Sequence, residues 1–142
     1  MNIDYKKLIK SILIPLVLGT IVGLITNSGY KDMIQPSFAP PGIVFPIVWG
    51  ILYILMGISN YLVSNNKYYY PQLVLNLLWS FIFFTFKLYL LAFVWILVLI
   101  VFVILMILDY YKENKVSAYI QVPYLFWLIF AAFLCFSVFR LN

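Results

Sequence analysis

The chain has 142 residues, of which 66% are hydrophobic and only 9% are charged, and its mean hydropathy is +1.08. A soluble domain carries about 25% charged residues to cover its surface, so this composition excludes a protein that faces water on all sides. The net charge of +5 comes from scattered basic residues. Nucleic-acid binding needs clustered ones, so we expect no nucleic-acid partner.

Long apolar stretches follow one another along the chain. A bilayer core of about 30 Å is crossed by roughly 20 apolar residues in a helix, whereas strands of a membrane barrel would be about 10 residues long with alternating polarity. The sequence therefore predicts an all-α integral membrane protein, a bundle of five transmembrane helices forming a single domain over residues 1–142. The predicted spans are about 8–27, 43–63, 71–87, 88–108 and 119–139.

The first predicted span has a basic start, as a signal peptide does. The apolar region of a signal peptide is about 7–15 residues long, and this run is longer and contains Pro15, which favours a retained span. Within it, Gly19 and Gly23 form a GxxxG pattern that lets helices approach closely. It could serve contacts within the bundle or a dimer, and we favour the bundle.

The loop at 28–42 is the longest connection between spans, with three prolines and several apolar residues. Loops of this length are usually functional or disordered, and disorder normally comes with low hydrophobicity. We therefore expect an ordered lid, with a flexible linker as the alternative.

Aromatic and polar residues recur at steps of three or four on three of the spans, which places each set on one face of its helix. The sets are Trp49, Tyr53, Met56, Gly57 and Asn60 on the second span, Gln72, Asn76, Trp79 and Phe83 on the third, and Tyr124, Trp127, Ala131, Leu134 and Cys135 on the fifth. Asn within hydrocarbon is costly without a partner, so the asparagines should face inward. The three faces either pack the core or line a cavity for a flat apolar ligand.

Residues for conventional enzyme chemistry are scarce. The sequence has no His, and its four carboxylates, on Asp4, Asp32, Asp109 and Glu113, lie at span ends or in loops. None is therefore an ionisable group within the membrane of the kind that marks ion pathways. We predict no metal site, no required cofactor and no conventional catalytic group.

Basic residues are unevenly distributed between the two sides of the five-span arrangement. Cytoplasmic loops carry an excess of Lys and Arg, so the side with more of them should be cytoplasmic. Lys6, Lys7, Lys10, Lys67, Lys112 and Lys115 lie on the side of the amino terminus, against Lys31, Lys87 and Arg140 on the other. The sequence therefore predicts a cytoplasmic amino terminus.

Several motifs resemble those of a known family. They are PSFAPP at 36–41, VFPIVWG at 44–50, LYILMG at 52–57, QLVLNLLW at 72–79, PYLFWL at 123–128 and the final RLN at 140–142. Together they resemble the TspO/MBR family, which comprises the tryptophan-rich sensory proteins of bacteria and the mitochondrial translocator protein, or peripheral benzodiazepine receptor.

The resemblance implies a five-helix bundle, often dimeric, with a pocket that the first loop closes. Such a pocket binds porphyrins, such as protoporphyrin IX, and benzodiazepine-type ligands. By position, Trp49, Asn76 and Trp127 match pocket residues of the family, Tyr30 and Pro41 match its lid, and Ala131 matches a position whose bulk affects ligand binding. The aromatic faces described above add Tyr53, Trp79 and Phe83 to this ligand-binding set. Trp49 and Trp127 also match tryptophans implicated in photo-oxidative porphyrin breakdown.

The chain departs from the family pattern in its first loop. Gly29-Tyr30 stands where the family often has Trp-Tyr, and Phe38 stands where it often has Trp. These replacements should thin the aromatic lid. A carboxy-terminal cholesterol motif would need Tyr at Phe136, so we do not predict cholesterol as a ligand.

The sequence and the resemblance together predict a membrane receptor or sensor that binds tetrapyrroles such as protoporphyrin IX, as a ligand and not as a cofactor. Two alternatives are a light- and oxygen-dependent porphyrin-degrading protein and a transporter of tetrapyrroles or lipids. The expected partners are a planar apolar ligand, membrane lipid and, as the family suggests, a second copy of the chain. The expected location is a bacterial cell membrane.

Overall fold

The computed structural model describes residues 2–26, 29–64 and 66–142, and helices are the only regular secondary structure in those ranges. The long helices are α1 (Tyr5–Thr26), α2 (Val44–Leu62), α3 (Tyr69–Ser80), α4 (Tyr89–Glu113) and α6 (Val122–Leu141), with the short α5 (Lys115–Ile120) before the last. A 3₁₀ turn, η1 (Tyr30–Asp32), follows α1, and a π-helical stretch, η2 (Phe81–Thr85), continues α3.

Four of the helical segments in the described ranges are long and apolar enough to cross a bilayer: α1, α2, α4 and the α5–α6 pair. The fifth segment, α3 with η2, is shorter, and it buries the polar side chains of Gln72, Asn76 and Ser80 against its neighbours. The fold class predicted from the sequence, an all-α bundle of five transmembrane helices, is confirmed.

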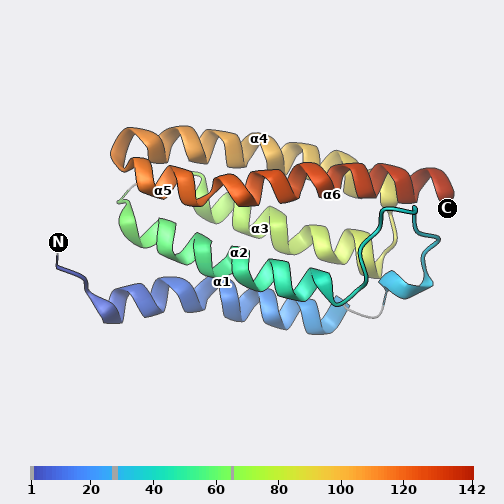
Figure 1. Ribbon diagram of the computed structural model, residues 1–142, viewed down its shortest axis with the longest axis horizontal. Coiled ribbons are helices and arrows are strands. Elements are labelled where there is room, and N and C mark those ends of the chain that lie inside the picture. Colours follow the sequence, from blue (N-terminus) through green and yellow to red (C-terminus); the bar gives the residue numbers. More distant parts are fainter. Residues whose placement is uncertain (1, 27–28, 65) are drawn as a thin grey trace.

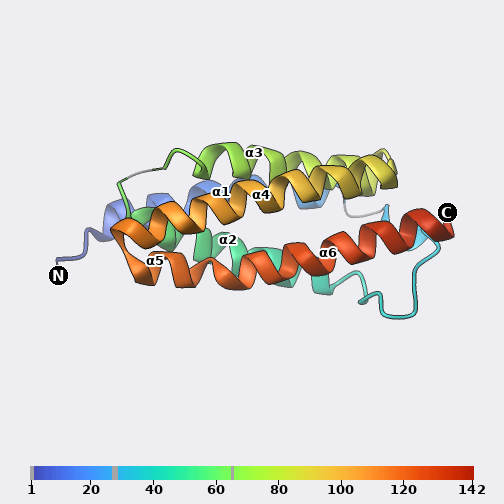
Figure 2. The ribbon, with the colours of Figure 1, turned by 90° about the horizontal axis from the view of Figure 1, so that it is seen from above.

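The helices pack side by side around one core (Figures 1 and 2). Going round the bundle, α1 contacts α2, α2 contacts α5, the α5–α6 pair contacts α4, α4 contacts α3, and α3 returns to α1. Both α2 and α3 therefore contact α1. The space between these three helices is separate from the contact between α4 and α6.

The helices differ from the predicted spans mainly at their ends. The last segment begins at Lys115, because the Asn114 side chain accepts hydrogen bonds from Val116 N (3.0 Å) and Ser117 N (3.3 Å) and so caps a new helix. The third predicted span extends to 87, but α-helical geometry ends at Ser80. Residues 27 and 28, which end the first predicted span and begin the predicted lid, lie outside the described residues.

The contact between α1 and α2 depends on a proline, which has no backbone N–H, and on a glycine, which has no side chain. Pro15 is buried within α1 and has no N–H to donate to the Ser11 carbonyl one turn earlier. Gly57 of α2 faces this point so closely that a Cβ on it would lie 2.6 Å from Ser11 O and 2.4 Å from Ile12 Cα. Close backbone approach through small residues stabilises helix pairs in membranes.

We expect Gly57→Ala to destabilise the protein by about 1–3 kcal/mol, because the added methyl overlaps the α1 backbone. Gly50→Ala is the matched control, since a Cβ there meets nothing within 4 Å. Thermal unfolding in detergent should show a lower midpoint for Gly57→Ala and an unchanged or higher one for Gly50→Ala. A Gly57→Ala midpoint equal to that of the wild type would contradict this account.

The loop after α1 is folded against one end of the bundle. Tyr30 and Met33 are buried, and the Tyr30 hydroxyl donates to the Pro40 carbonyl at 2.8 Å. The Asn142 side chain accepts from Ile34 N (3.1 Å) and donates to Ile34 O (2.8 Å), which ties the loop to the end of α6. These contacts make residues 29–43 an ordered cover, which we call the lid loop.

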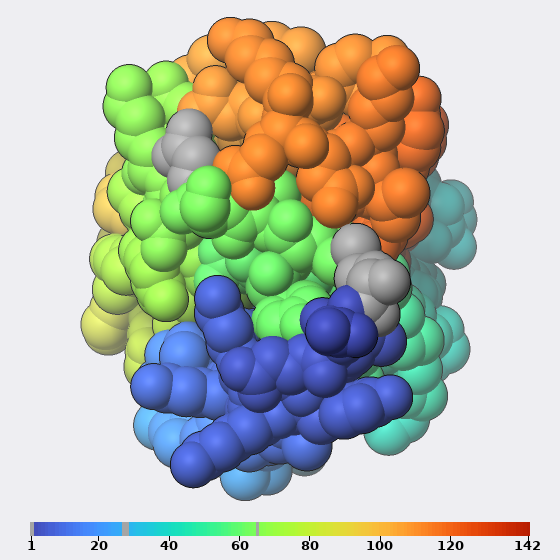
Figure 3. Space-filling model, turned by 90° about the vertical axis from the view of Figure 1, so that its left-hand side faces the viewer, coloured from blue at the N-terminus to red at the C-terminus, as the bar shows by residue number. Residues whose placement is uncertain are grey.

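The opposite end of the bundle, seen in Figure 3, brings together the start of α1, the α2–α3 connection and the turn between α4 and α5. These segments carry Lys6, Lys7, Lys10, Lys67, Lys112 and Lys115, whereas the lid end carries Lys31, Lys87 and Arg140. The uneven distribution of basic residues found in the sequence is therefore present in the fold, where one end of the bundle carries more of them than the other.

Candidate ligand-binding site

A buried chain of hydrogen bonds connects α2, α3 and α6. The Tyr53 hydroxyl donates to Asn76 Oδ1 at 2.6 Å, and Asn76 Nδ2 donates to the Tyr124 hydroxyl at 2.9 Å. The Tyr124 hydroxyl in turn donates to Gln72 Oε1 at 2.7 Å. Both amides are almost fully buried, at 1% exposure for Asn76 and 0% for Gln72. This arrangement satisfies the expectation that Asn76 finds a partner across the bundle.

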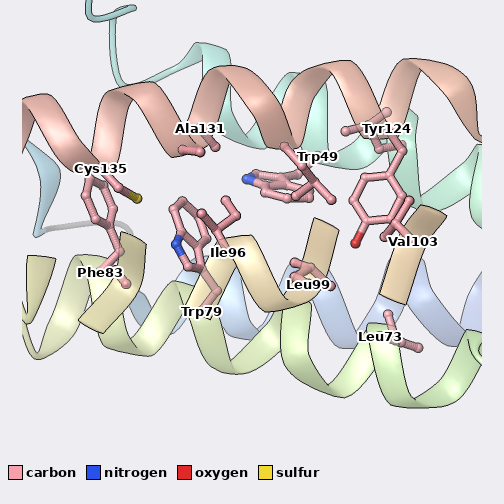
Figure 4. Packing of buried hydrophobic residues seen from close by; sticks show 14 of the residues in the cluster. Trp49, Leu73, Trp79, Phe83, Ile96, Leu99, Val103, Tyr124, Ala131 and Cys135 are labelled. Atoms are coloured by element: carbon pink, nitrogen blue, oxygen red, sulfur yellow. The ribbon is translucent and has the colours of Figure 1, made fainter. Parts of the chain in front are cut away.

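Aromatic rings fill the interior next to this chain (Figure 4). Trp79 stacks on Phe83 with ring centroids 5.1 Å apart and planes at 8°. Trp49 lies 6.2 Å from Trp79 and 6.3 Å from Tyr124. Figure 4 shows Ala131 of α6 pointing into the same packed region. Most residues of the predicted inward faces of the second, third and fifth spans therefore meet in a closed core.

We expect Tyr124→Phe to cost more stability than Tyr53→Phe. Loss of the Tyr124 hydroxyl leaves Asn76 Nδ2 and Gln72 Oε1 without a partner, whereas loss of the Tyr53 hydroxyl frees only Asn76 Oδ1. Each buried unsatisfied group costs about 1–3 kcal/mol. Thermal unfolding of both variants in one detergent measures the order, and the reverse order would contradict this network.

The main cavity lies on the other side of α2, between α1, α2, η2 and the lid loop, and its volume is about 650 Å³. Aromatic and apolar groups form most of its wall, with a few polar groups among them. From α1 come Gly19, Thr20, Gly23, Leu24 and Thr26; from the lid loop Tyr30, Lys31, Gln35, Gly42 and Ile43; from α2 Phe45, Pro46, Trp49, Gly50 and Tyr53; and from α3 and η2 Ser80 and Phe84.

Two glycines open this cavity. A Cβ placed on Gly23 of α1 or on Gly50 of α2 would meet nothing within 4 Å. Gly19, one turn before Gly23, instead packs against the Tyr53 ring, where a Cβ would lie 2.0 Å from a ring carbon. The two residues of the GxxxG pattern therefore do different things: Gly19 makes a close contact within the bundle and Gly23 leaves space.

The lid loop closes one end of the cavity through an aromatic cluster. The Tyr30 ring lies 4.7 Å from that of Phe45 and 6.1 Å from that of Phe84, with Phe45 and Phe84 5.5 Å apart. Gly29 lies against the backbone of Phe84, where a Cβ would overlap the carbonyl oxygen. The residue that replaces the frequent tryptophan of the family therefore lets this loop sit close to η2.

A second, more open hollow of about 450 Å³ lies between α2 and α6. Trp127 contributes to its wall, and the Trp127 ring lies 6.2 Å from that of Trp49 at 88°. Because Trp49 lines the main cavity, these two indoles together form a partition between the two hollows.

The residues predicted to bind a ligand fall into three groups. Tyr30, Trp49 and Tyr53 line the main cavity, and Trp127 lines the second hollow. Pro41 is exposed on the lid loop, next to Gly42, which lines the main cavity. The remaining predicted residues, Asn76, Trp79, Phe83 and Ala131, are buried in the closed core.

Several cavity residues were not singled out from the sequence as ligand-binding. On α2 they are Phe45, Pro46 and Gly50. With Trp49 and Tyr53 they form a second stripe at steps of three and four, next to the stripe that faces the core. A tryptophan can belong to both stripes because its ring is wide. The cavity lining could have been predicted from that second stripe together with Gly23 of the GxxxG pattern.

The composition of the cavity wall resembles that of a site for an organic ligand. No Asp, Glu, Cys or His is among the described residues that line it, and its charged group is Lys31 at the lid end. Apolar pockets of about 300–1,000 Å³ with a few placed polar groups are typical sites for small organic ligands.

Comparison with known proteins agrees with this architecture. The model of the TspO/MBR family matches residues 11–141. The chain belongs to the TspO/MBR family. TspO/MBR relatives include the tryptophan-rich protein TspO of Archaeoglobus fulgidus, which is 35% identical over 96% of this chain and 97% of its own length.

Two further TspO/MBR relatives come from distant sources. The tryptophan-rich sensory protein of Cereibacter sphaeroides is 31% identical over 80% of this chain and 76% of its own length. The human translocator protein is 32% identical over 80% of this chain and 74% of its own length. Membership of the TspO/MBR family and the apolar helices together make this an integral membrane protein.

Proposed function

We propose that this protein is a membrane receptor or sensor that binds tetrapyrroles such as protoporphyrin IX in the cavity between α1, α2 and the lid loop. The observation that carries the proposal is that cavity itself, about 650 Å³ in volume and lined by Tyr30, Trp49 and Tyr53. Stacking of flat rings adds about 0.5–1.5 kcal/mol per pair beyond area burial. The names of two relatives, a tryptophan-rich sensory protein and a translocator protein, agree with a receptor role.

We propose that the same cavity also takes benzodiazepine-type ligands, which are largely apolar and carry aromatic rings that can pack against its wall. A shared site predicts competition between such a ligand and protoporphyrin IX. If the two ligands bound independently, at most one of them would occupy this cavity.

We expect Gly23→Leu to abolish saturable binding of protoporphyrin IX, and Gly23→Ala to weaken it less. Gly23 lines the cavity, and a Cβ added there meets nothing within 4 Å, so a larger side chain at this position should take up part of the open volume. Both substitutions raise helix propensity, so the variants should remain folded. The measurement is a titration in the dark that follows quenching of tryptophan fluorescence.

Ile21→Leu is the control for this series, because Ile21 is 50% exposed on the same helix and does not line the cavity. It should bind as the wild type does. If Gly23→Leu bound protoporphyrin IX with unchanged affinity, the ligand would not occupy this cavity.

A second function, light- and oxygen-dependent breakdown of bound porphyrin, draws support from the Trp49–Trp127 contact. Trp49 lines the cavity and Trp127 lies directly behind it, with ring centroids 6.2 Å apart. The excited ligand would take one electron from Trp49, and Trp127 would then reduce the oxidised Trp49. Dioxygen would accept the electron from the reduced ligand to give superoxide, which would attack the porphyrin ring. Under illumination in air, Trp49→Phe and Trp127→Phe should each slow the loss of porphyrin absorbance. If both variants lost absorbance at the rate of the wild type, the protein would not break down porphyrin through these tryptophans.

We further propose a bacterial cell membrane as the location, with the amino terminus in the cytoplasm. The excess of basic residues at the end that holds the start of α1 supports this orientation. Under this orientation the lid loop and the cavity mouth lie on the outer side. The surrounding lipid and a second copy of the chain remain the proposed partners of the bundle surface.

A further inference from the structure

The charged groups at the lid end of the bundle are not balanced. This end carries three basic side chains, those of Lys31, Lys87 and Arg140, but a single acidic side chain, that of Asp32. Asp32 Oδ2 lies 3.9 Å from Lys87 Nζ, so its charge is already matched by a residue outside the cavity. No ion pair to Lys31 occurs within the described ranges.

Lys31 is the charged residue of the cavity wall, and it lies at one end of that wall. It belongs to η1 in the lid loop, beside Tyr30. Gln35 also lines this end, and its Nε2 donates to the Tyr30 carbonyl at 3.0 Å. The outer end of the cavity therefore combines a cation with an amide, and the lid loop supplies both.

The inner part of the cavity has a different character. Along α2 the lining extends from Phe45 to Tyr53, which is about 12 Å at the rise of an α-helix. Over that depth the wall is formed by Trp49, by the glycines at 23 and 50 and by other neutral residues. A ligand that fits both parts has a flat apolar body and an anionic group at one edge.

We propose that the cavity selects planar apolar acids, and that Lys31 determines this specificity by pairing with a carboxylate of the ligand at the cavity mouth. The inference rests on the proposed function, since it concerns the same cavity. It assigns to Lys31 a role that neither the aromatic stripes nor the family motifs indicated.

The test compares protoporphyrin IX, which has two carboxylates, with its dimethyl ester, which has the same ring system and no charge. Both are titrated in the dark, in a neutral detergent free of phospholipid, against the wild type, Lys31→Gln, Lys31→Arg and Arg140→Gln. Arg140 is the control, an exposed cation at the same end that does not line the cavity.

For the wild type we expect the acid to bind about fivefold more tightly than the ester, a ratio typical of a partly exposed ion pair. Lys31→Gln should remove this difference by weakening the acid alone, and Lys31→Arg should restore it. Arg140→Gln should leave the difference in place. High salt should reduce the preference in the wild type and have little effect in Lys31→Gln, because screening acts on the ion pair.

Other outcomes overturn the inference in distinguishable ways. Equal affinity of the wild type for acid and ester would exclude the role of Lys31 while leaving the proposed function intact, whereas binding of neither would remove the proposed function itself. A parallel loss of acid and ester binding in Lys31→Gln would mean that Lys31 only supports the fold of the lid. If phosphatidylglycerol abolished the preference of the wild type for the acid and left the binding of both ligands to Lys31→Gln unchanged, the partner of Lys31 in a membrane would be a lipid phosphate and not the ligand.

Discussion

The hydrogen-bonded chain from Tyr53 through Asn76 and Tyr124 to Gln72 is the constraint on which the bundle depends. Hydrocarbon offers polar groups no partner, so three helices that each carry amides or hydroxyls in mid-span must bring those groups together. Doing so fixes the rotation of α2, α3 and α6 about their own axes. The positions of the large aromatic rings follow from that rotation.

The position of the cavity is a consequence of this arrangement. With the Tyr53 hydroxyl of α2 turned toward Asn76 of α3, the adjacent face of α2, bearing Pro46 and Gly50, is left to α1. The buried residues of α1 are only Pro15, Gly19 and Thr26, so this helix contributes close backbone contact and not bulky side chains. A wall made of glycines on one side and aromatic rings on the other leaves room for a flat molecule.

Helix positions and inward-facing residues could be predicted from the sequence because hydrophobic length and helical periodicity determine them directly. Gln72, Asn76 and Tyr124 were placed on inward stripes, and the structure joins them. The location of the open space could not be predicted in this way, since it depends on which of two adjacent stripes on α2 is filled by neighbours. Trp95 shows the same limit: its Nε1 donates to the Leu75 carbonyl at 2.9 Å, a contact that no pattern within α4 indicates. Periodicity identifies faces, whereas cavities arise from how the faces of different helices fit.

The tie between Asn142 and Ile34 has a practical consequence for work on this protein. Residues at the end of α6 hold the lid loop in place through both polar atoms of one side-chain amide. A purification tag or fluorescent fusion attached after Asn142 would begin beside the cavity cover and would compete with that contact. A label on the amino terminus lies at the far end of the bundle (Figure 1), so variants labelled there are the ones in which ligand affinities can be compared without altering the cover itself.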